Sequence, residues 1–234
     1  MDNLLDEPSS VIQRYAMRSS SVDDARYSML NPAVWQAIQE RQREICRLLS
    51  FYSPKSLSEL QILEVGCGSG SNLLELLRIG CGPANLVGNE LLPDRLEAAR
   101  IRLPQATQIL SGDASLLNWD EGSFDIVYQS TVFSSLLDDA FQDLLARKMW
   151  AWVRPGGAVL WYDFIYDNPR NPDVRGVPIK RIKHLFPEAR IRARRVTLAP
   201  PISRCVCKIH PGLYSILNMT PLLRTHVLCW LEKT

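Results

Sequence analysis

The sequence predicts an α/β protein built on a largely parallel sheet with helices on both faces. Short apolar runs alternate with amphipathic segments through the middle of the chain, and such alternation requires crossover connections between parallel strands. The first apolar run stops at a cluster of glycines. The last third departs from this alternation, because its two apolar runs are separated only by a proline-punctuated stretch.

The predicted elements can be placed in order along the chain. Asn31-Pro32 has the form of a helix start, an N-cap followed by proline at the first helical position. The helix predicted from Pro32 to about Ser50 carries its apolar residues roughly on one face: Trp35, Ile38, Ile45, Leu48 and Leu49. Strands are predicted at residues 61–65, 85–90, 108–110, 124–128, 158–162, 189–198 and 225–231. Helices are predicted at residues 72–78, 94–102 and 139–153, and a turn at residues 154–157.

A length of 234 residues predicts a single domain, which we divide into three parts. Residues 1–55 form an N-terminal helical arm or lid, residues 56–165 form the core, and residues 166–234 form the C-terminal part. An insertion at about residues 199–224 separates the last two strands. Its apolar residues indicate a short helix with an apolar face: Leu213, Ile216, Leu217 and Met219.

Composition narrows the classes of partner. The net charge of +2 is too small to argue for nucleic acid or an anionic membrane. The acidic N-terminus lacks the apolar run of a signal peptide, and no stretch approaches the ~18 apolar residues of a spanning helix. The six cysteines form no CxxC pair, so no metal site is predicted. We therefore expect a cytoplasmic protein with reduced thiols and no membrane or nucleic-acid partner, and a homodimer stays open.

Three features at consecutive strand ends indicate a nucleotide-like ligand. The loop Gly66-x-Gly68-x-Gly70 joins a strand to a helix, where glycines permit a tight turn and the helix N-terminus offers free N–H groups. Glu90 ends the second strand, and a carboxylate there can accept hydrogen bonds from ribose hydroxyls. Asp113 ends the third strand and can accept from an adenine amino group. A structural turn, a solvated acid and an Asx turn are the alternatives, but they do not explain the order and spacing of the set.

Five segments in this order resemble the motifs of class I (Rossmann-like) S-adenosylmethionine-dependent methyltransferases of the small-molecule type. The resemblance covers about residues 60–165 and rests on the segments at residues 63–70, 87–90, 112–114, 124–127 and 154–157. It implies a doubly wound, mostly parallel sheet of seven strands with one antiparallel strand near the C-terminus. Asn89-Glu90 departs from the commoner Val-Asp, and the glutamate keeps the ribose role.

The resemblance also implies a site for S-adenosyl-L-methionine. The glycine loop would hold the amino-acid part, Glu90 the ribose, Asp113 and Ala114 the adenine, and Gln129 would lie near the sulfonium. In similar enzymes an N-terminal tyrosine often touches the cofactor. The residues expected to bind the cofactor are Tyr15, Glu64, Gly66, Cys67, Gly68, Gly70, Glu90, Leu91, Asp113, Ala114 and Gln129.

Four segments are expected to surround an acceptor: the arm from Val11 to Leu30, Ser130–Ser135, Asp163–Val177 and Ala199–Arg224. Asp163, at the end of the fifth strand, is the first choice for a catalytic base, and His210 in the insertion is the one histidine expected to act as a base. A structural Asx role for Asp163 and a surface role for His210 stay open. The basic residues between Lys180 and Arg195 predict a solvated face, with a pocket for a phosphorylated or carboxylated acceptor as the alternative.

The predicted function is methyl transfer to a small-molecule acceptor. O-methylation of a sugar, glycan precursor or secondary metabolite is favoured, and N- or C-methylation in natural product biosynthesis is the alternative. An NAD-dependent oxidoreductase would use Glu90 in the same way, but no further β-α-β unit follows the fifth strand. A non-catalytic cofactor-binding protein that serves as an interaction module is the third alternative.

Overall fold

The computed structural model describes residues 7–19, 28–53, 55–169 and 171–234. The part of the predicted arm at residues 20–27 lies outside the described residues. None of the described helices is long and apolar enough to cross a lipid bilayer. The described His, Cys, Asp and Glu side chains form no cluster of three or more that could hold a metal ion.

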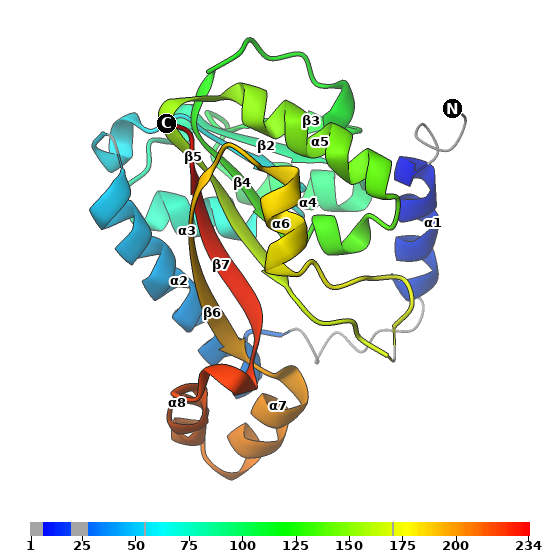
Figure 1. The fold of residues 1–234 in the computed structure, drawn as a ribbon, viewed down its shortest axis with the longest axis vertical. Helices are drawn as coiled ribbons and strands as arrows, with labels where there is room; N and C mark the ends of the chain where they lie inside the picture. Colours follow the sequence, from blue (N-terminus) through cyan, green and yellow to red (C-terminus); the bar gives the residue numbers. More distant parts are fainter. Residues whose placement is uncertain (1–6, 20–27, 54, 170) are drawn as a thin grey trace.

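Seven strands form one sheet in the order β3-β2-β1-β4-β5-β7-β6 (Figure 1). Their bounds are β1 Ile62–Val65, β2 Leu86–Glu90, β3 Gln108–Ser111, β4 Phe124–Ser130, β5 Val153–Phe164, β6 Arg190–Leu198 and β7 Arg224–Glu232. Strands β1 to β5 pair in parallel, while β7 is antiparallel to both β5 and β6. The predicted fold class is therefore confirmed, including the single antiparallel strand near the C-terminus.

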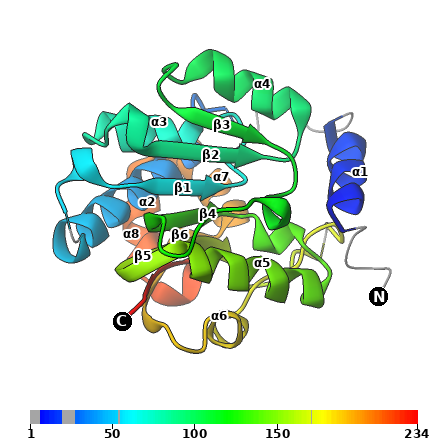
Figure 2. The ribbon, with the colours of Figure 1, turned by 90° about the horizontal axis from the view of Figure 1, so that it is seen from above.

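Helices cover both faces of this sheet. The α-helices are α1 Glu7–Ser19, α2 Pro32–Tyr52, α3 Ser71–Arg78, α4 Pro93–Arg102, α5 Asp139–Trp152, α6 Ile179–Leu185, α7 Pro200–Ile209 and α8 Gly212–Asn218. Short 3-10 helices lie at Leu57–Glu59, Pro83–Asn85, Ala114–Leu116, Phe133–Ser135 and Pro221–Leu223. Seen from above, α1 stands beside the ends to which the arrows of β1, β2 and β3 point (Figure 2).

Side chains alternate along each strand and so divide the core in two. Leu63 of β1 and Trp161 of β5 belong to the cluster that packs against α5 and α6, which we call the α5 face. Ile62 and Leu160 belong to the cluster that packs against α2, α3 and α4, which we call the α2 face. Any polar side chain at a strand end must therefore face one helical layer or the other.

Two local predictions need correction. Trp35 is 45% exposed, because it lies two positions from the buried Ala33 and therefore on the far side of α2. The predicted turn at residues 154–157 lies inside β5, where the pairing jumps from Phe124–Val153 to Ile126–Ala158 and the intervening residues bulge. The predicted start of α2 is confirmed, since Asn31 Oδ1 accepts from Ala33 N–H (3.1 Å).

The insertion between β6 and β7 forms the helical pair α7 and α8 at one end of the molecule (Figure 1). It is fastened to α2 by a buried hydrogen bond from Tyr214 Oη to Glu40 Oε2 (2.8 Å). The apolar residues of the predicted short helix do not share one buried face. Leu213 and Leu217 are partly buried, whereas Ile216 and Met219 are 63% and 77% exposed.

Candidate active site

A pocket opens at the carboxyl edge of the sheet, between the ends of β1, β2 and β4 and the helix α1. Six residues expected to bind the cofactor line it: Tyr15, Gly66, Glu90, Leu91, Asp113 and Ala114. The loop after β4 contributes Ser130, Thr131, Val132 and Ser135, as expected for that segment. Parallel strands bring these residues together because their carboxyl ends meet at one edge of the sheet.

The glycine loop has the backbone conformation that its residue types allow. Gly66 and Gly68 have φ angles of +66° and +58°, which side chains other than glycine rarely adopt. A Cβ on Gly66 would lie 2.5 Å from Val132 Cγ2, so the loop there is packed tightly. A Cβ on Gly68 would meet nothing within 4 Å, so the loop there borders open space. This is the arrangement expected where a ligand approaches the backbone.

The two acidic residues at the strand ends are held by backbone groups. Glu90 Oε2 accepts from Gly68 N–H (2.7 Å) and Glu90 Oε1 from Leu92 N–H (2.8 Å). Asp113 accepts from Ser115 N–H (2.8 Å) and from Ser115 Oγ (2.7 Å), which is the Asx-type cap considered from the sequence. Each carboxylate oxygen retains a second lone pair, so the caps fix both groups in the pocket without using up their capacity to accept.

Helix α1 closes the outer side of this pocket. Glu7 Oε1 accepts from Leu137 N–H (2.7 Å), and Arg14 donates to the carbonyl oxygen of Ser135 (2.8 Å). Tyr15 Oη lies 3.1 Å from Ser135 Oγ, and the guanidinium of Arg95 lies 4.5 Å from the centre of the Tyr15 ring. Arg95 also lines the pocket and was not anticipated from the sequence. The arm therefore contributes a docked helix with its tyrosine turned to the site.

Glu64 lies beside this pocket, on the α2 face. Its side chain is fully buried and burial raises its pKa to about 8, against a lowering by the hydrogen bond from Asn72 and the charge of Arg41. Asn72 Nδ2 donates to Glu64 Oε1 (2.6 Å), while Glu64 Oε2 has no hydrogen-bond partner among the described residues. This oxygen therefore has the capacity to accept a hydrogen bond from a bound molecule.

Arg41 of α2 completes this group and was missed from the sequence. Its guanidinium donates to Asn72 Oδ1 (2.8 Å) and to Ser130 Oγ (3.4 Å), and Ser130 lines the pocket. The Asn72 amide thus joins the cation of Arg41 to the carboxyl group of Glu64. The sequence contains no signal for it, because Arg41 belongs to a polar run with the composition of a solvated helix face.

Four other expected residues do not line the pocket. Cys67 is buried, and burial raises the pKa of its thiol, so it is an apolar packing residue and no thiolate ligand. Gln129 is fully buried, donates to the carbonyl oxygen of Tyr162 (3.3 Å) and accepts from Val132 N–H (3.0 Å). Gly68 and Gly70 shape the turn, and Gly70 precedes α3 with a φ of +80°.

The two expected bases are not brought to the pocket. Asp163 is fully buried on the α5 face, where its carboxylate accepts from Ser134 N–H (3.1 Å) and Phe164 N–H (2.9 Å). Burial raises its pKa to about 7. His210 is exposed in the turn between α7 and α8, and its Nδ1 accepts from Gly212 N–H (3.1 Å). The structural alternatives given above therefore describe both residues.

The remaining expectations concern the polar loop after β5 and the basic segment. The loop is tied to the rest of the site by Arg175 N–H, which donates to the carbonyl oxygen of Ser134 (2.8 Å). In the basic segment Arg181 pairs with Asp143 (2.9 Å) and Arg194 with Glu44 (2.9 Å). Arg192 pairs with Glu232. These ion pairs agree with a solvated face.

Comparisons with known proteins agree with this geometry. Residues 62–157 match the family described as methyltransferase domain. A biotin biosynthesis bifunctional protein, BioCD, of Bordetella avium is 34% identical over 99 residues, which are 42% of this chain and 20% of that protein. A trans-aconitate 2-methyltransferase of Methylobacterium radiotolerans is 31% identical over 131 residues, which are 55% of this chain and 47% of that protein.

The fold is also found among solved structures. An S-adenosylmethionine-dependent methyltransferase from Mesorhizobium loti superposes with a TM-score of 0.59 over 81% of this chain and 97% of that one, at 16% identity. The chain spans less than half the length of the two curated relatives it matches. The family match, the strand order and the loop at Gly66 to Gly70 together show that residues 62–157 form a methyltransferase domain and that the chain has the fold of the class I (Rossmann-like) S-adenosylmethionine-dependent methyltransferases.

Proposed function

We propose that this protein transfers a methyl group from S-adenosylmethionine to an oxygen of a small polar molecule, such as a sugar, a glycan precursor or a secondary metabolite. The observation that carries the proposal is the pairing of a pocket, lined by the glycine loop and by Glu90 and Asp113, with the cation of Arg41 and an unpartnered carboxyl oxygen of Glu64 beside it. The amino-acid end of the cofactor carries an ammonium and a carboxylate. A nicotinamide dinucleotide has no such end.

The residues on this edge fit the cofactor from one end to the other. Glu64 Oε2 would accept from the ammonium group, and Arg41 would bind the carboxylate. Glu90 would accept from the ribose hydroxyls, and Asp113 from the adenine amino group. Tyr15 and Arg95 would cover the nucleoside from outside. The positions of Glu64, Arg41, Glu90 and Asp113 are already set by their own hydrogen bonds.

The bound cofactor supplies an activated methyl group on a sulfonium, so the protein mainly has to hold the acceptor in line and exclude water. The segments around the opening suit a polar acceptor. Ser130 and Thr131 present hydroxyls at the end of β4, and the loop after β5 carries Asp167, Asn168 and Asn171. The relative named for trans-aconitate, a small polar acid, agrees with an acceptor of this kind.

Calorimetry with S-adenosylhomocysteine and with NAD tests the cofactor part of this proposal. We expect S-adenosylhomocysteine to bind and NAD to give no heat. A Glu90→Ala variant should lose that binding while keeping its circular dichroism spectrum. Glu97→Ala, which removes an exposed carboxylate from α4, is the matched control and should bind like the parent protein. Absence of S-adenosylhomocysteine binding by the parent protein would overturn the proposal.

Transfer of a labelled methyl group to a panel of acceptors tests the chemistry. The panel contains methyl glycosides, phenols, hydroxy acids and small amines, and products are assigned by mass spectrometry. We expect label on oxygen. Label on nitrogen or carbon would favour the alternative acceptor classes. Binding of S-adenosylhomocysteine with no transfer to any compound would favour a cofactor-binding interaction module.

A further inference from the structure

We propose that His226 is the base that accepts the proton of a hydroxyl acceptor, and that this hydroxyl lies on the α2 face at the ends of β5 and β7. The inference rests on the function proposed above and names the group that this function requires for an alcohol or phenol. It replaces Asp163 and His210, the two bases expected from the sequence.

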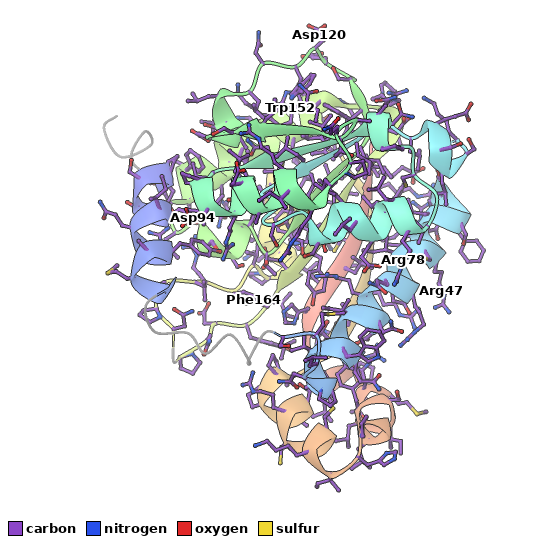
Figure 3. The ribbon with its side chains drawn as sticks, turned by 180° about the vertical axis from the view of Figure 1, so that it is seen from behind. Arg47, Arg78, Asp94, Asp120, Trp152 and Phe164 are labelled. Carbon is purple, nitrogen blue, oxygen red and sulfur yellow. The ribbon has the colours of Figure 1, made fainter. Side chains whose placement is uncertain are left out.

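His226 lies at the same edge of the sheet as the cofactor pocket, although it is near the start of its strand. Strand β7 is antiparallel to β5, so its first residues lie beside the last residues of β5. His226 pairs with Phe164, the last residue of β5, and on the other side with Val196 of β6. Phe164 marks this edge in Figure 3, at the opposite end of the sheet from Asp120.

Aromatic side chains fix the orientation of the imidazole. The His226 ring stacks on Tyr162 with 5.1 Å between ring centres and 15° between planes, and it meets the Phe164 ring edge-on at 5.9 Å and 71°. Nδ1 of His226 lies 3.0 Å from Thr225 Oγ1. With the proton on Nδ1 and donated to Thr225, the lone pair is on Nε2, which has no hydrogen-bond partner among the described residues. The residue is half-buried, so it is not fully enclosed by the protein.

Tyr162 connects His226 to the group proposed to hold the cofactor. The Tyr162 ring contacts both His226 and Arg41, whose guanidinium carbon lies 4.9 Å from the ring centre. Arg41 in turn donates to Ser130, which lines the cofactor pocket. Tyr162, Arg41 and Ser130 thus form a continuous row of contacts from the pocket to His226.

A strained residue holds Tyr162 in place. Tyr162 Oη lies 2.9 Å from Oγ1 of Thr197, a β-branched residue with a φ of +64°. The Thr197 N–H donates to the buried carboxylate of Glu40 (3.0 Å), which also accepts from Tyr214 Oη. Such strain persists only where surrounding contacts enforce it, and it is concentrated at functional sites. In this protein the contacts of Thr197 hold the Tyr162 ring on which His226 stacks.

The surroundings of His226 favour the neutral form of its imidazole. Burial and the nearby positive charge of Arg41 lower the pKa of His226 to about 4. Among the described residues, Tyr162 on β5 is the other titratable group in contact with the His226 ring. Glu40 on α2 acts on Tyr162 and is held by Thr197 and Tyr214. A cofactor carboxylate on Arg41 would offset the charge of the guanidinium. The basicity of His226 should therefore rise when the cofactor is bound.

The step is balanced as follows. A lone pair of the acceptor oxygen forms the new bond to the methyl carbon, and the carbon–sulfur bond breaks with its electron pair remaining on sulfur. The hydroxyl proton passes to Nε2 of His226. The oxygen gains positive charge as the new bond forms, so its proton becomes strongly acidic and a weak base that is always neutral suffices.

Histidine NMR tests the charge coupling without any acceptor. The chain has three histidines, so single substitutions to Gln at His184, His210 and His226 assign the imidazole signals. We expect the pKa of His226 to lie well below the ~6.5 of an unperturbed histidine and to rise when S-adenosylhomocysteine is added to saturation. A His226 signal with an unperturbed pKa that does not respond to the compound would overturn the proposal. Failure of the compound to bind at all, seen by calorimetry, would instead overturn the proposed function.

Kinetics with the best hydroxyl compound of the acceptor panel test the base itself. His226→Gln should lower kcat by a factor of about 100 to 10,000 and leave the affinity for S-adenosylhomocysteine within about threefold. His226→Ala should be partly rescued by added imidazole, which a merely structural role would not permit. His184→Gln is the control and should keep full activity. Unchanged kcat in His226→Gln, loss of cofactor affinity, or a parent protein that methylates only amines or carbon would each overturn the assignment.

Discussion

The two faces of the sheet present different polar clusters at the same carboxyl edge. On the α5 face, Asp163 and Gln129 are fully buried, and both accept from backbone N–H groups of the loop after β4, while Gln129 also donates to the carbonyl oxygen of Tyr162 on β5. On the α2 face, Glu64 is equally buried, but one of its oxygens has no partner among the described residues. Both carboxyl groups have a raised pKa, about 7 for Asp163 and about 8 for Glu64, and burial is the main cause in each.

The comparison shows that burial and a shifted pKa do not identify a functional carboxylate by themselves. Asp163 satisfies its own hydrogen bonds and thereby fixes the loop Ser130–Ser135. Glu64 leaves an acceptor atom free beside a cation and a pocket. The distinction lies in the surroundings of the buried group, since the hydrogen bonds of Asp163 stabilise the fold, whereas Glu64 combines an unpartnered oxygen with a neighbouring cation and pocket.

Removing the positive charge of Arg41 on the α2 face should reduce cofactor affinity the most. Arg41→Gln is expected to weaken S-adenosylhomocysteine binding by about 100-fold or more, because the loss of one partner of an enclosed charge pair typically costs ~2–5 kcal/mol. Calorimetry measures the change. Arg47→Gln, on the same helix but with an exposed side chain (Figure 3), is the matched control. If both variants bind alike, Arg41 does not hold the cofactor carboxylate.

Replacing the carboxyl group of Glu64 should weaken S-adenosylhomocysteine binding less than Arg41→Gln does. It should also abolish a proton release that accompanies binding. Glu64→Gln is expected to weaken binding by about 10- to 100-fold, since a charge-assisted hydrogen bond contributes roughly 1.5–3 kcal/mol. With a pKa of about 8, Glu64 is mainly protonated near neutral pH before binding. The ammonium group lowers that pKa, so binding should release a proton.

Calorimetry in buffers with different ionisation enthalpies counts the released proton. The parent protein should release a fraction of a proton at about pH 7, and Glu64→Gln should release none. An equal proton count in the two proteins would show that the ammonium group does not meet Glu64. In that case the unpartnered oxygen would have a role other than cofactor binding.

On the α5 face, Asp163→Asn should change stability and leave binding alone. The pKa of Asp163 in the folded protein, about 7, is above the ~3.9 of an unfolded aspartate. The folded state therefore holds a proton that the unfolded state has lost, and the free energy of unfolding falls as pH rises from about 4 to about 7. The variant lacks this titration, so its stability should depend less steeply on pH over that range.

Urea unfolding at several pH values measures this slope, and calorimetry measures binding. We expect S-adenosylhomocysteine affinity within about threefold of the parent, a difference of less than ~1 kcal/mol. A large loss of affinity with an unchanged slope would remove the distinction between the two faces. It would also restore Asp163 as a candidate site residue.

The sequence was sufficient for the parts of the site that are local along the chain. The loop from Gly66 to Gly70, Glu90 and Asp113 each follow directly from a strand, and parallel pairing brings consecutive strand ends to one edge. The fold class was predictable for the same reason. Asp163 lies at the expected edge but does not line the pocket, because its buried carboxylate accepts from Ser134 N–H and Phe164 N–H.

Residues that reach the site from distant segments could not be found in this way. Arg41 belongs to the charged run Glu40-Arg41-Gln42-Arg43, which has the composition of a solvated helix face. Only the packing of α2 on the sheet shows that Glu40 is buried and that Arg41 meets Asn72. His226 depends on the antiparallel register that places it beside Phe164, and a register is set by long-range pairing rather than by local pattern.

The smallest expected effect concerns His210, and it tests whether the insertion takes part in the chemistry. His210→Gln should leave S-adenosylhomocysteine affinity and methyl transfer within about twofold of the parent, because an exposed side chain away from a site usually changes free energies by less than ~0.5 kcal/mol. Its Nδ1 accepts only from Gly212 N–H in the turn between α7 and α8, and the Gln side chain can replace that bond. A large loss of kcat would mean that α7 and α8 move over the acceptor during the reaction. The buried bond between Tyr214 and Glu40 opposes such a movement, so Tyr214→Phe in the same assay would show whether that fastening restrains the insertion.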